Sequence, residues 1–310
     1  MNRLLLLIYP LFLCSCNLLI VVDRKQEKRF KREEIPLATF HDSSGIHSIH
    51  HSNKGREKIV LVHGYGSSGI GQFYRSAIAL NESYDVILPD LLYCGKSKGD
   101  GSAHSYTIDA QVEHLKNMLD SIEVVEPFVL LGNSYGGIVS AYFAEKYPEL
   151  VKKLVIYDSP VNAYSLSYAD SLAHSMDVPS VKELLSPTNI PENRKSLDII
   201  FYDQPYIPRF LRRQMIKYGS IPARPTQLQL LNHLMVNEAE YNAHHFKWKM
   251  PVYLCWGEFD MLIPMSTCRA VMNKYSIPEK NLHIFPKAAH AANVEYPEEF
   301  VMYVREVMSK

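Results

Sequence analysis

The sequence predicts an α/β fold in which a mostly parallel sheet is covered by helices on both faces and carries an inserted helical lid. Short aliphatic runs without polar alternation are typical of strands buried on both faces of a parallel sheet. These runs alternate with helical stretches, which is the pattern of an α/β domain. The alternation stops over one long interval, 159–249. The chain has 310 residues, 47% of them hydrophobic, which is enough for one large core.

The strands and helices outside that interval can be placed in order. An antiparallel hairpin comes first, with strands Leu37–His41 and Ile46–Ser52 around a turn at residues 43–45. The later strands are expected at Lys58–Val62, Asp85–Leu88, Val129–Leu131, Leu154–Tyr157, Pro251–Trp256 and Leu282–Phe285. The helices between and after them are expected at Ser105–Ile122, Ile138–Lys146 and Glu298–Met308.

The most informative motif is the turn Gly132-Asn133-Ser134-Tyr135-Gly136, which follows an apolar strand and precedes a helix. This pattern predicts a nucleophilic serine, because the turn lifts the hydroxyl above the sheet. Side chains two residues before or after Ser134 would collide with neighbouring backbone, so glycine is needed there. The helix directs the positive end of its dipole toward the serine, and the backbone N–H of Tyr135 is left to bind an oxyanion.

Three other loops follow buried strands. His63–Ser68 is rich in glycine, and the backbone N–H of Tyr65 is the expected second oxyanion donor. Asp260 follows one late strand, and His290 follows the last. Ser134, Asp260 and His290 therefore each lie just past the carboxyl end of a strand, in that order along the chain.

Together these motifs resemble those of the α/β-hydrolase superfamily, from about Leu37 to the C-terminus. The resemblance rests on H-G-x-G, on G-N-S-Y-G-G, on G-E-F-D before a proline, and on A-A-H before Glu295, Pro297 and Phe300. It implies a catalytic triad: Ser134 as nucleophile, His290 as general base and then acid, and Asp260 as the group that orients the imidazole. It implies no cofactor.

Two positions leave alternatives open. Asp158 ends its own strand, where some members of the superfamily place the triad acid, so it competes with Asp260; the motif around Asp260 matches more closely. The loop Pro89–Ser97 resembles the superfamily's D-x-P-G-x-G-x-S loop but lacks its proline and first glycine, so the shape of that pocket wall is open.

The resemblance implies a serine hydrolase that cleaves a carboxylic ester of a small or medium, largely apolar substrate through an acyl-enzyme. A carbon–carbon bond hydrolase and an acyltransferase use the same triad and are the alternatives. Carbon–carbon bond hydrolases typically have an aromatic residue directly after the catalytic histidine, whereas this chain has Ala291 after His290. A ligand receptor that does not catalyse is the alternative from another class. Ser134 argues against epoxide hydrolases and haloalkane dehalogenases, which use a carboxylate nucleophile.

The composition indicates neither a nucleic acid partner nor a metal site. Lys and Arg number 33, as do Asp and Glu, so nothing indicates nucleic acid binding. Cys94, Cys255 and Cys268 have unrelated spacings and predict neither a disulfide framework nor a metal site. Four histidines near the first hairpin lack carboxylate or cysteine partners at ligand spacing, so we expect a solvated face rather than a metal site: His41, His47, His50 and His51. The oligomeric state is not predicted.

The N-terminus predicts attachment to a membrane. Residues 1–22 form a targeting segment: an apolar run, Leu4–Leu13, leads into Leu13-Cys14-Ser15-Cys16, which resembles a bacterial lipobox with Cys16 as the lipidated residue. This predicts a cell-envelope lipoprotein. The alternative is an uncleaved anchor, Leu4–Val22, with the basic residues after it held in the cytoplasm. Residues 23–36 are expected to be a charged spacer, or a basic face toward anionic lipid.

Residues 37–310 then form the hydrolase domain. Its interval 159–249 contains helical stretches at Val178–Leu185, Pro208–Lys217 and Thr226–Met235. A loop of this length without secondary structure is uncommon, so we expect a helical lid over Ser134.

Overall fold

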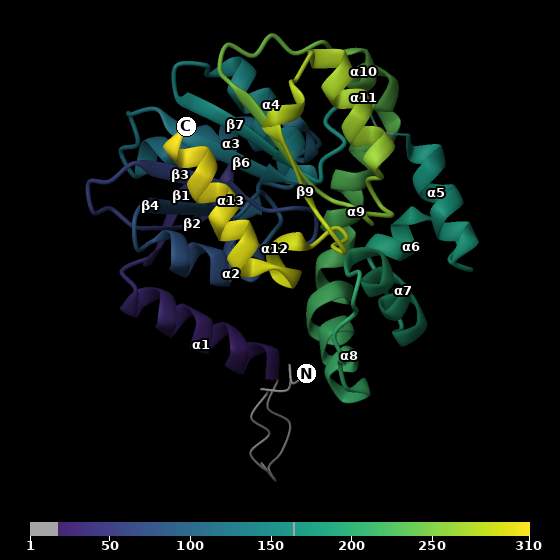
Figure 1. The fold of residues 1–310 in the computed structure, drawn as a ribbon. Coiled ribbons are helices and arrows are strands. Elements are labelled where there is room, and N and C mark those ends of the chain that lie inside the picture. The colour runs from purple at the N-terminus through teal and green to yellow at the C-terminus, as the bar shows by residue number, and fades with distance from the viewer. Residues whose placement is uncertain (1–17, 164) are drawn as a thin grey trace.

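The centre of the molecule is a nine-stranded sheet in the order β1-β2-β4-β3-β6-β7-β8-β9, with β5 paired to β2 (Figure 1). The structure is a computed structural model that describes residues 18–163 and 165–310. The strands are β1 (Leu37–Asp42), β2 (Gly45–His51), β3 (Lys58–Val62), β4 (Asp85–Pro89), β5 (Lys98–Gly99), β6 (Phe128–Asn133), β7 (Val151–Tyr157), β8 (Val252–Gly257) and β9 (Leu282–Phe285).

The pairing explains why the aliphatic strands lack polar alternation. All the strand pairs from β4 through β3, β6, β7 and β8 to β9 are parallel. The three pairs that involve β2 are antiparallel. Alternate side chains of the central strands enter two separate cores: Val60 and Leu130 on one face, Leu61 and Leu131 on the other. The predicted fold class, a mostly parallel sheet with helices on both faces, is confirmed.

The two faces are covered by different helices (Figure 1). One core includes residues of α3 (Ile108–Ser121), α4 (Tyr135–Lys146) and α11 (Met265–Tyr275). The other includes residues of α1 (Leu18–Arg32), α2 (Gly69–Leu80) and α13 (Pro297–Ser309). The short elements η1 (His104–Tyr106), η3 (Glu279–Asn281) and α12 (Ala292–Glu295) lie in the connections. α4 begins directly after Ser134, three residues earlier than its expected start.

The long interval between β7 and β8 contains helices in the described residues. They form the group of helices beside the sheet in Figure 1. The helices are α5 (Leu166–Ser175), α6 (Val181–Leu185), α7 (Ile190–Ile200), α8 (Arg209–Gln214), η2 (Met215–Ser220), α9 (Ile221–Val236) and α10 (Glu238–Ala243).

Two histidines of the first hairpin are buried, which corrects the expected solvated face. β2 lies inside the sheet between β1 and β4, and helices α3 and α1 cover its two faces. His47 packs against His114 of α3, with their Nδ1 atoms 2.6 Å apart, and its Nε2 lies 2.8 Å from Asp42. His50 lies on the opposite face beneath Phe30. The sequence argument failed because it placed this hairpin at the surface.

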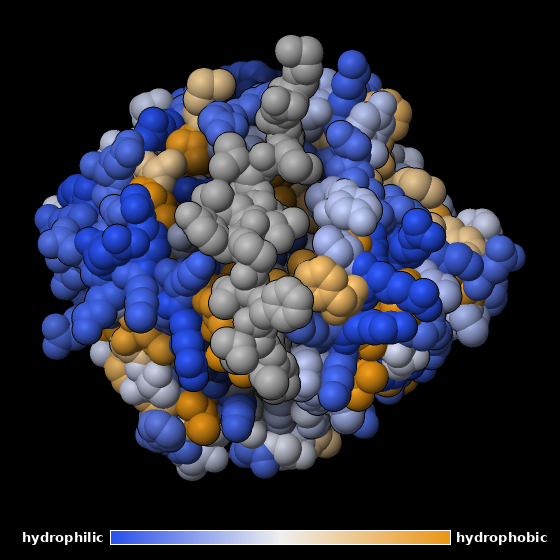
Figure 2. Space-filling model, turned by 90° about the horizontal axis from the view of Figure 1, so that it is seen from below, coloured by the Kyte–Doolittle hydropathy of each residue, from blue (hydrophilic) through white to orange (hydrophobic). Residues whose placement is uncertain are grey.

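The described N-terminal residues form helix α1. Helix α1 crosses the expected boundary between residues 22 and 23, and the segment expected to be a spacer packs on the domain. Phe30 is fully buried, stacks on Tyr74 at 5.5 Å and meets the ring of His50 edge-on, and Ile35 is fully buried too. Because this segment is rich in charged residues, the burial of Phe30 and Ile35 was not predicted from the sequence. α1 lies on the underside of the molecule in Figure 1, which Figure 2 shows from below.

Within the described residues, no helix is long and apolar enough to cross a membrane. The expected targeting run and Cys16 lie outside the described residues.

Candidate active site

Ser134 occupies a strained turn at the carboxyl end of β6. Its φ of 52° and ψ of −120° lie in a region that residues other than glycine rarely adopt, at a cost on the order of 1–3 kcal/mol. Backbone hydrogen bonds hold this conformation: the Ser134 N–H donates to Tyr157 O at 2.9 Å, and its carbonyl accepts from Gly137 N at 2.9 Å. The hydroxyl of Ser159 also donates to that carbonyl, at 2.6 Å. The surrounding fold therefore enforces the sharp turn that the motif predicts.

The flanking glycines are required by space. A Cβ on Gly132 would lie 2.3 Å from the carbonyl oxygen of Gly136, and a Cβ on Gly136 would lie 2.3 Å from that of His63. Both distances are far shorter than van der Waals contact allows, and both neighbours are backbone. The expectation that side chains at these positions would collide is confirmed.

Two backbone N–H groups near the serine are available to a ligand. Tyr65 and Tyr135 line the same cavity as Ser134. In the part of the chain that the structure describes, neither N–H donates to a protein acceptor. Tyr135 is the first residue of α4, where the helix dipole favours negative charge. This arrangement suits a developing oxyanion.

One side chain that the sequence argument missed joins the two oxyanion segments. Gln72 of α2 accepts from the N–H of Gly64 at 2.8 Å, and its amide donates to Asn133 Oδ1 at 2.7 Å. Asn133 in turn donates to Tyr157 O at 3.3 Å. The glycine-rich loop and the serine turn are therefore fixed relative to each other. Only the asparagine within the motif could have suggested this link.

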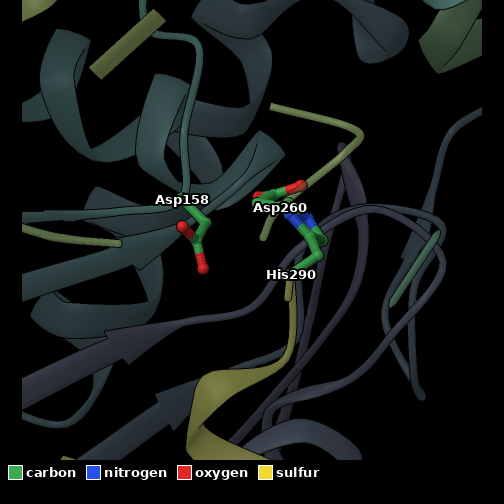
Figure 3. Close-up of side chains that lie close together, drawn as sticks. All are labelled: Asp158, Asp260 and His290. Atoms are coloured by element: carbon green, nitrogen blue, oxygen red, sulfur yellow. Dashed lines mark hydrogen bonds and ion pairs between the residues drawn. The ribbon is translucent and has the colours of Figure 1, made fainter. Parts of the chain in front are cut away.

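Asp260 and His290 form a hydrogen-bonded pair (Figure 3). His290 Nδ1 lies 2.7 Å from Asp260 Oδ2. The other carboxylate oxygen accepts from the N–H groups of Leu262 and Ile263, at 2.8 and 2.9 Å. The Asp260 side chain is fully buried and that of His290 is 11% exposed. An ionised carboxylate only accepts, so this contact places the proton on Nδ1 and leaves Nε2 as the basic atom.

The structure brings two of the three expected triad residues into contact. Ser134 lines the cavity, but within the described residues no hydrogen bond joins its hydroxyl to His290. Such contacts are often longer in ligand-free enzymes and tighten when substrate binds.

Asp158 lies beside this pair without a hydrogen bond to the histidine (Figure 3). One ligating atom each from Asp158, Asp260 and His290 falls within 4.8 Å of the others. Asp158 Oδ1 accepts from Gly257 N at 2.9 Å, while Oδ2 has no partner in the described structure. Burial, together with the charge of Asp260, raises the pKa of Asp158 well above its usual range. Because the imidazole is hydrogen-bonded to Asp260 and not to Asp158, the geometry favours Asp260 as the partner of His290.

The cavity above the serine is small and mostly apolar. Its volume is about 90 Å³. Glu238, at the start of α10, is its single charged lining residue among those the structure describes, and no Lys or Arg lines it. The apolar walls come from both the sheet edge and the lid, including Ile138, Val161, Leu166, Leu185, Leu231, Leu234, Leu262 and Ile263.

The loop Pro89–Ser97 does not contribute to that lining, as far as the structure describes the chain. The carboxylate of Asp90 holds the loop in place. Its Oδ1 accepts from Gly69 N at 2.9 Å. Its Oδ2 accepts from the Ser48 hydroxyl and from Lys96 N, each at 2.9 Å. A Cβ on Gly95, whose φ is 54°, would lie 2.2 Å from that carboxylate. The loop therefore keeps a tight shape without the proline and first glycine of the superfamily pattern.

Glu295 connects the histidine loop to the lid. One of its carboxylate oxygens accepts from Ala289 N at 2.9 Å, and the other accepts from Tyr202 N and Asp203 N at 2.8 and 3.1 Å. The resemblance identified Glu295 as part of a motif, but the sequence did not reveal this structural role.

Comparison with known proteins is consistent with this geometry. A family model described as the alpha/beta hydrolase fold matches residues 58–180. Lipase 1 of Psychrobacter immobilis is 27% identical over 270 residues, which cover 86% of this chain and 81% of that protein. A 2-hydroxy-6-oxononadienedioate/2-hydroxy-6-oxononatrienedioate hydrolase of Paraburkholderia phymatum is also 27% identical, over 81% of this chain and 88% of its own length.

The fold is shared with a solved bacterial membrane phospholipase A. That structure superposes with a TM-score of 0.77 at 22% identity, covering 94% of this chain and 90% of the other. The lipase and carbon–carbon bond hydrolase relatives support a serine hydrolase. These matches and the fold support membership of the α/β-hydrolase superfamily.

Proposed function

We propose that this chain is a carboxylic ester hydrolase whose substrate has a small, uncharged and largely apolar acyl group. The observation that supports this most directly is the cavity beside Ser134, which has aliphatic walls, one carboxylate and no lining cation among the described residues. Apolar surface of this kind favours an alkyl chain.

The chemistry follows from the placement of the residues. Ser134 Oγ attacks the ester carbonyl while His290 Nε2 takes its proton, and Asp260 stabilises the imidazolium that forms. The N–H groups of Tyr65 and Tyr135 bind the oxyanion. Collapse of the tetrahedral intermediate expels the alcohol, which takes the proton from His290. Water then attacks the acyl-enzyme by the same route and releases the acid.

The same cavity argues against the carbon–carbon bond alternative. The relatives of that class are named for dioates, which carry two carboxylates. In this chain a bound carboxylate would meet Glu238 without a neighbouring Lys or Arg among the described lining residues. Like charges in a partly desolvated cavity repel strongly, because the local dielectric is low.

A substrate panel tests the proposal. The full-length protein in detergent should cleave p-nitrophenyl esters, with kcat/KM highest for short and medium acyl chains and little turnover of dienedioate ring-cleavage products. Faster cleavage of the dioate than of any ester would reject ester hydrolysis as the main activity. Acyl transfer to an added alcohol in preference to water would indicate an acyltransferase. A protein that turns over none of these substrates and resists a fluorophosphonate probe would be the receptor.

We also propose that the enzyme is attached to a membrane through its N-terminus, either by lipid on Cys16 or by an uncleaved span Leu4–Val22. The apolar run and the cysteine motif of the sequence support this. Intact-mass analysis of the membrane-extracted protein separates the two. A lipid-modified chain beginning at Cys16 rules out the anchor, and an unmodified chain that retains residues 1–22 rules out the lipoprotein.

A further inference from the structure

Positive charge is concentrated on two segments that touch each other on the underside of the molecule. α1 and the run Arg209–Ser220, which comprises α8 and η2, together hold ten Lys and Arg and two acidic residues. The whole chain holds 33 of each kind. The N–H of Leu18 joins the segments by donating to Gln214 Oε1 at 2.8 Å. The two basic segments thus form one continuous surface.

Four of the six cations of α1 share one exposed face of the helix. They repeat at the i, i+3, i+4, i+7 spacing of one helix face and are exposed: Lys25, Lys28, Arg29 and Arg32. Phe30 and Glu27, on the other side of the helix, make its contacts with the domain. The cations also line an open groove beside Tyr74 and Ile78 of α2. Arg29 pairs with Glu33 at 2.6 Å, and the charges of Lys25, Lys28 and Arg32 are presented to the outside.

The second segment combines cations with exposed apolar side chains. Arg209, Arg213 and Lys217 are exposed, whereas Arg212 is buried and hydrogen-bonded within the lid. Phe210 lies among them and is 58% exposed. Tyr206 just before this segment and Ile20 and Val22 at the start of α1 are exposed as well. Figure 2 shows this side, with hydrophilic side chains crowded around hydrophobic ones.

We propose that this surface, the outer faces of α1 and of Arg209–Ser220, docks on an anionic phospholipid bilayer. Basic side chains are attracted to anionic headgroups, and exposed aromatic and aliphatic side chains between them enter the interface. Nucleic acid or an acidic protein would neutralise the cations, but neither would account for the exposure of Phe210 and Ile20. The apolar run Leu4–Leu13 precedes α1 with four residues between them, and this proximity also favours a membrane. This contact is made by the folded domain, and it does not depend on ester hydrolysis.

Quenching of tryptophan by brominated lipids tests the docking independently of the N-terminal attachment. The full-length chain would be reconstituted into vesicles of equal phosphatidylglycerol and brominated phosphatidylcholine, carrying F210W or, as control, V125W. Val125 is 78% exposed in the loop before β6, outside both basic segments. We expect the quenching added by F210W to exceed that added by V125W by about twofold or more.

The charge dependence is measured on the same samples. The quenching of F210W should fall to that of V125W in pure phosphatidylcholine and in the K25Q/K28Q/R209Q/R213Q background. It should fall in the same way in salt of about 0.5 M, where the Debye length is about 4 Å. An unchanged far-ultraviolet circular dichroism spectrum and an unchanged Tm would show that this background is folded. Equal quenching of F210W and V125W on anionic vesicles overturns the proposal, as does excess quenching that persists without anionic lipid.

Discussion

The edge of the sheet that carries Ser134 and the underside formed by α1 and α8 are built in opposite ways. At the sheet edge, Asn133, Asp260 and Glu295 are buried and hydrogen-bonded to backbone or side chains. On the underside, the cations of α1 and those of α8 other than the buried Arg212 are exposed. Reaction geometry needs fixed positions, which buried hydrogen bonds provide. Attraction to a charged surface needs only exposed charge. Substitutions should therefore be severe at the first region and mild at the second.

The largest effect is expected from Ser134→Ala. If Ser134 is the nucleophile, the change should lower kcat by about a millionfold, as loss of the serine does in a serine protease, and abolish fluorophosphonate labelling. Ser171→Ala on exposed α5 is the matched control and should change neither. Labelling that survives in Ser134→Ala would place the nucleophile elsewhere.

The next effect separates the two aspartates beside His290. Asp260→Asn should lower kcat by up to about ten-thousandfold, because the amide cannot stabilise the imidazolium. Asp158→Asn should cost far less and retain the fold, since Asp158 makes no hydrogen bond to His290 and an amide has a similar shape. Steady-state kinetics with a p-nitrophenyl ester measures both. The opposite ranking would transfer the role of triad acid to Asp158.

Packing around the serine turn predicts a loss of stability. Gly132→Ala should lower the free energy of unfolding by about 3 kcal/mol, because the new methyl would overlap backbone 2.3 Å away. Gly219→Ala is the control: no atom lies within 4 Å of its Cβ position, so it should be neutral or stabilising by up to about 1 kcal/mol. Denaturant unfolding of both variants checks this. Equal stabilities would mean that the turn can relax.

Glu295→Gln tests the connection between the histidine loop and the lid. Gln retains one acceptor oxygen, but its NH₂ group would face backbone N–H donors, so we expect about a tenfold decrease in kcat/KM. Glu298→Gln, on the exposed start of α13, is the control and should have no effect. A Glu295→Gln enzyme with unaltered kinetics would show that this connection does not position His290.

The smallest effect is expected at Glu27, which docks α1. Burial alone would raise the pKa of this carboxyl, but hydrogen bonds from His50 and Lys96 outweigh it and lower the pKa to about 2. A lowered pKa contributes stability above the ordinary value of 4.5 that is lost as the pH falls toward 2. Glu27→Gln should therefore lower Tm by about 1–2 °C at pH 7, and the difference from wild type should shrink by pH 3.

Glu126→Gln is the matched control for this measurement. Glu126 pairs with Lys58 at the surface, where its side chain is 74% exposed, so its loss should leave Tm unchanged at both pH values. A Glu27→Gln difference that stays constant between pH 7 and pH 3 would show that its ion pairs do not stabilise the docking of α1.

The features that could be predicted from sequence depend on local pattern. The strands around Val60 and Leu130, the first hairpin and the need for Gly132 and Gly136 follow from hydrophobic runs and from sterics within a short turn. The features that were missed depend on which distant segments meet. The Gln72 to Asn133 link, the burial of His50 and the docking of Phe30 each join residues more than 19 positions apart, so no spacing in the sequence encodes them.

The contacts of Glu295 also constrain how the lid can move. Tyr202 and Asp203 share its carboxylate with the loop of His290, and the N–H of Ala291 donates to Ile200 O at 3.0 Å. A displacement of α7 would pull on the general base or break several buried hydrogen bonds at once. Motion that admits substrate without disturbing the base must therefore leave α7 in place beside the sheet.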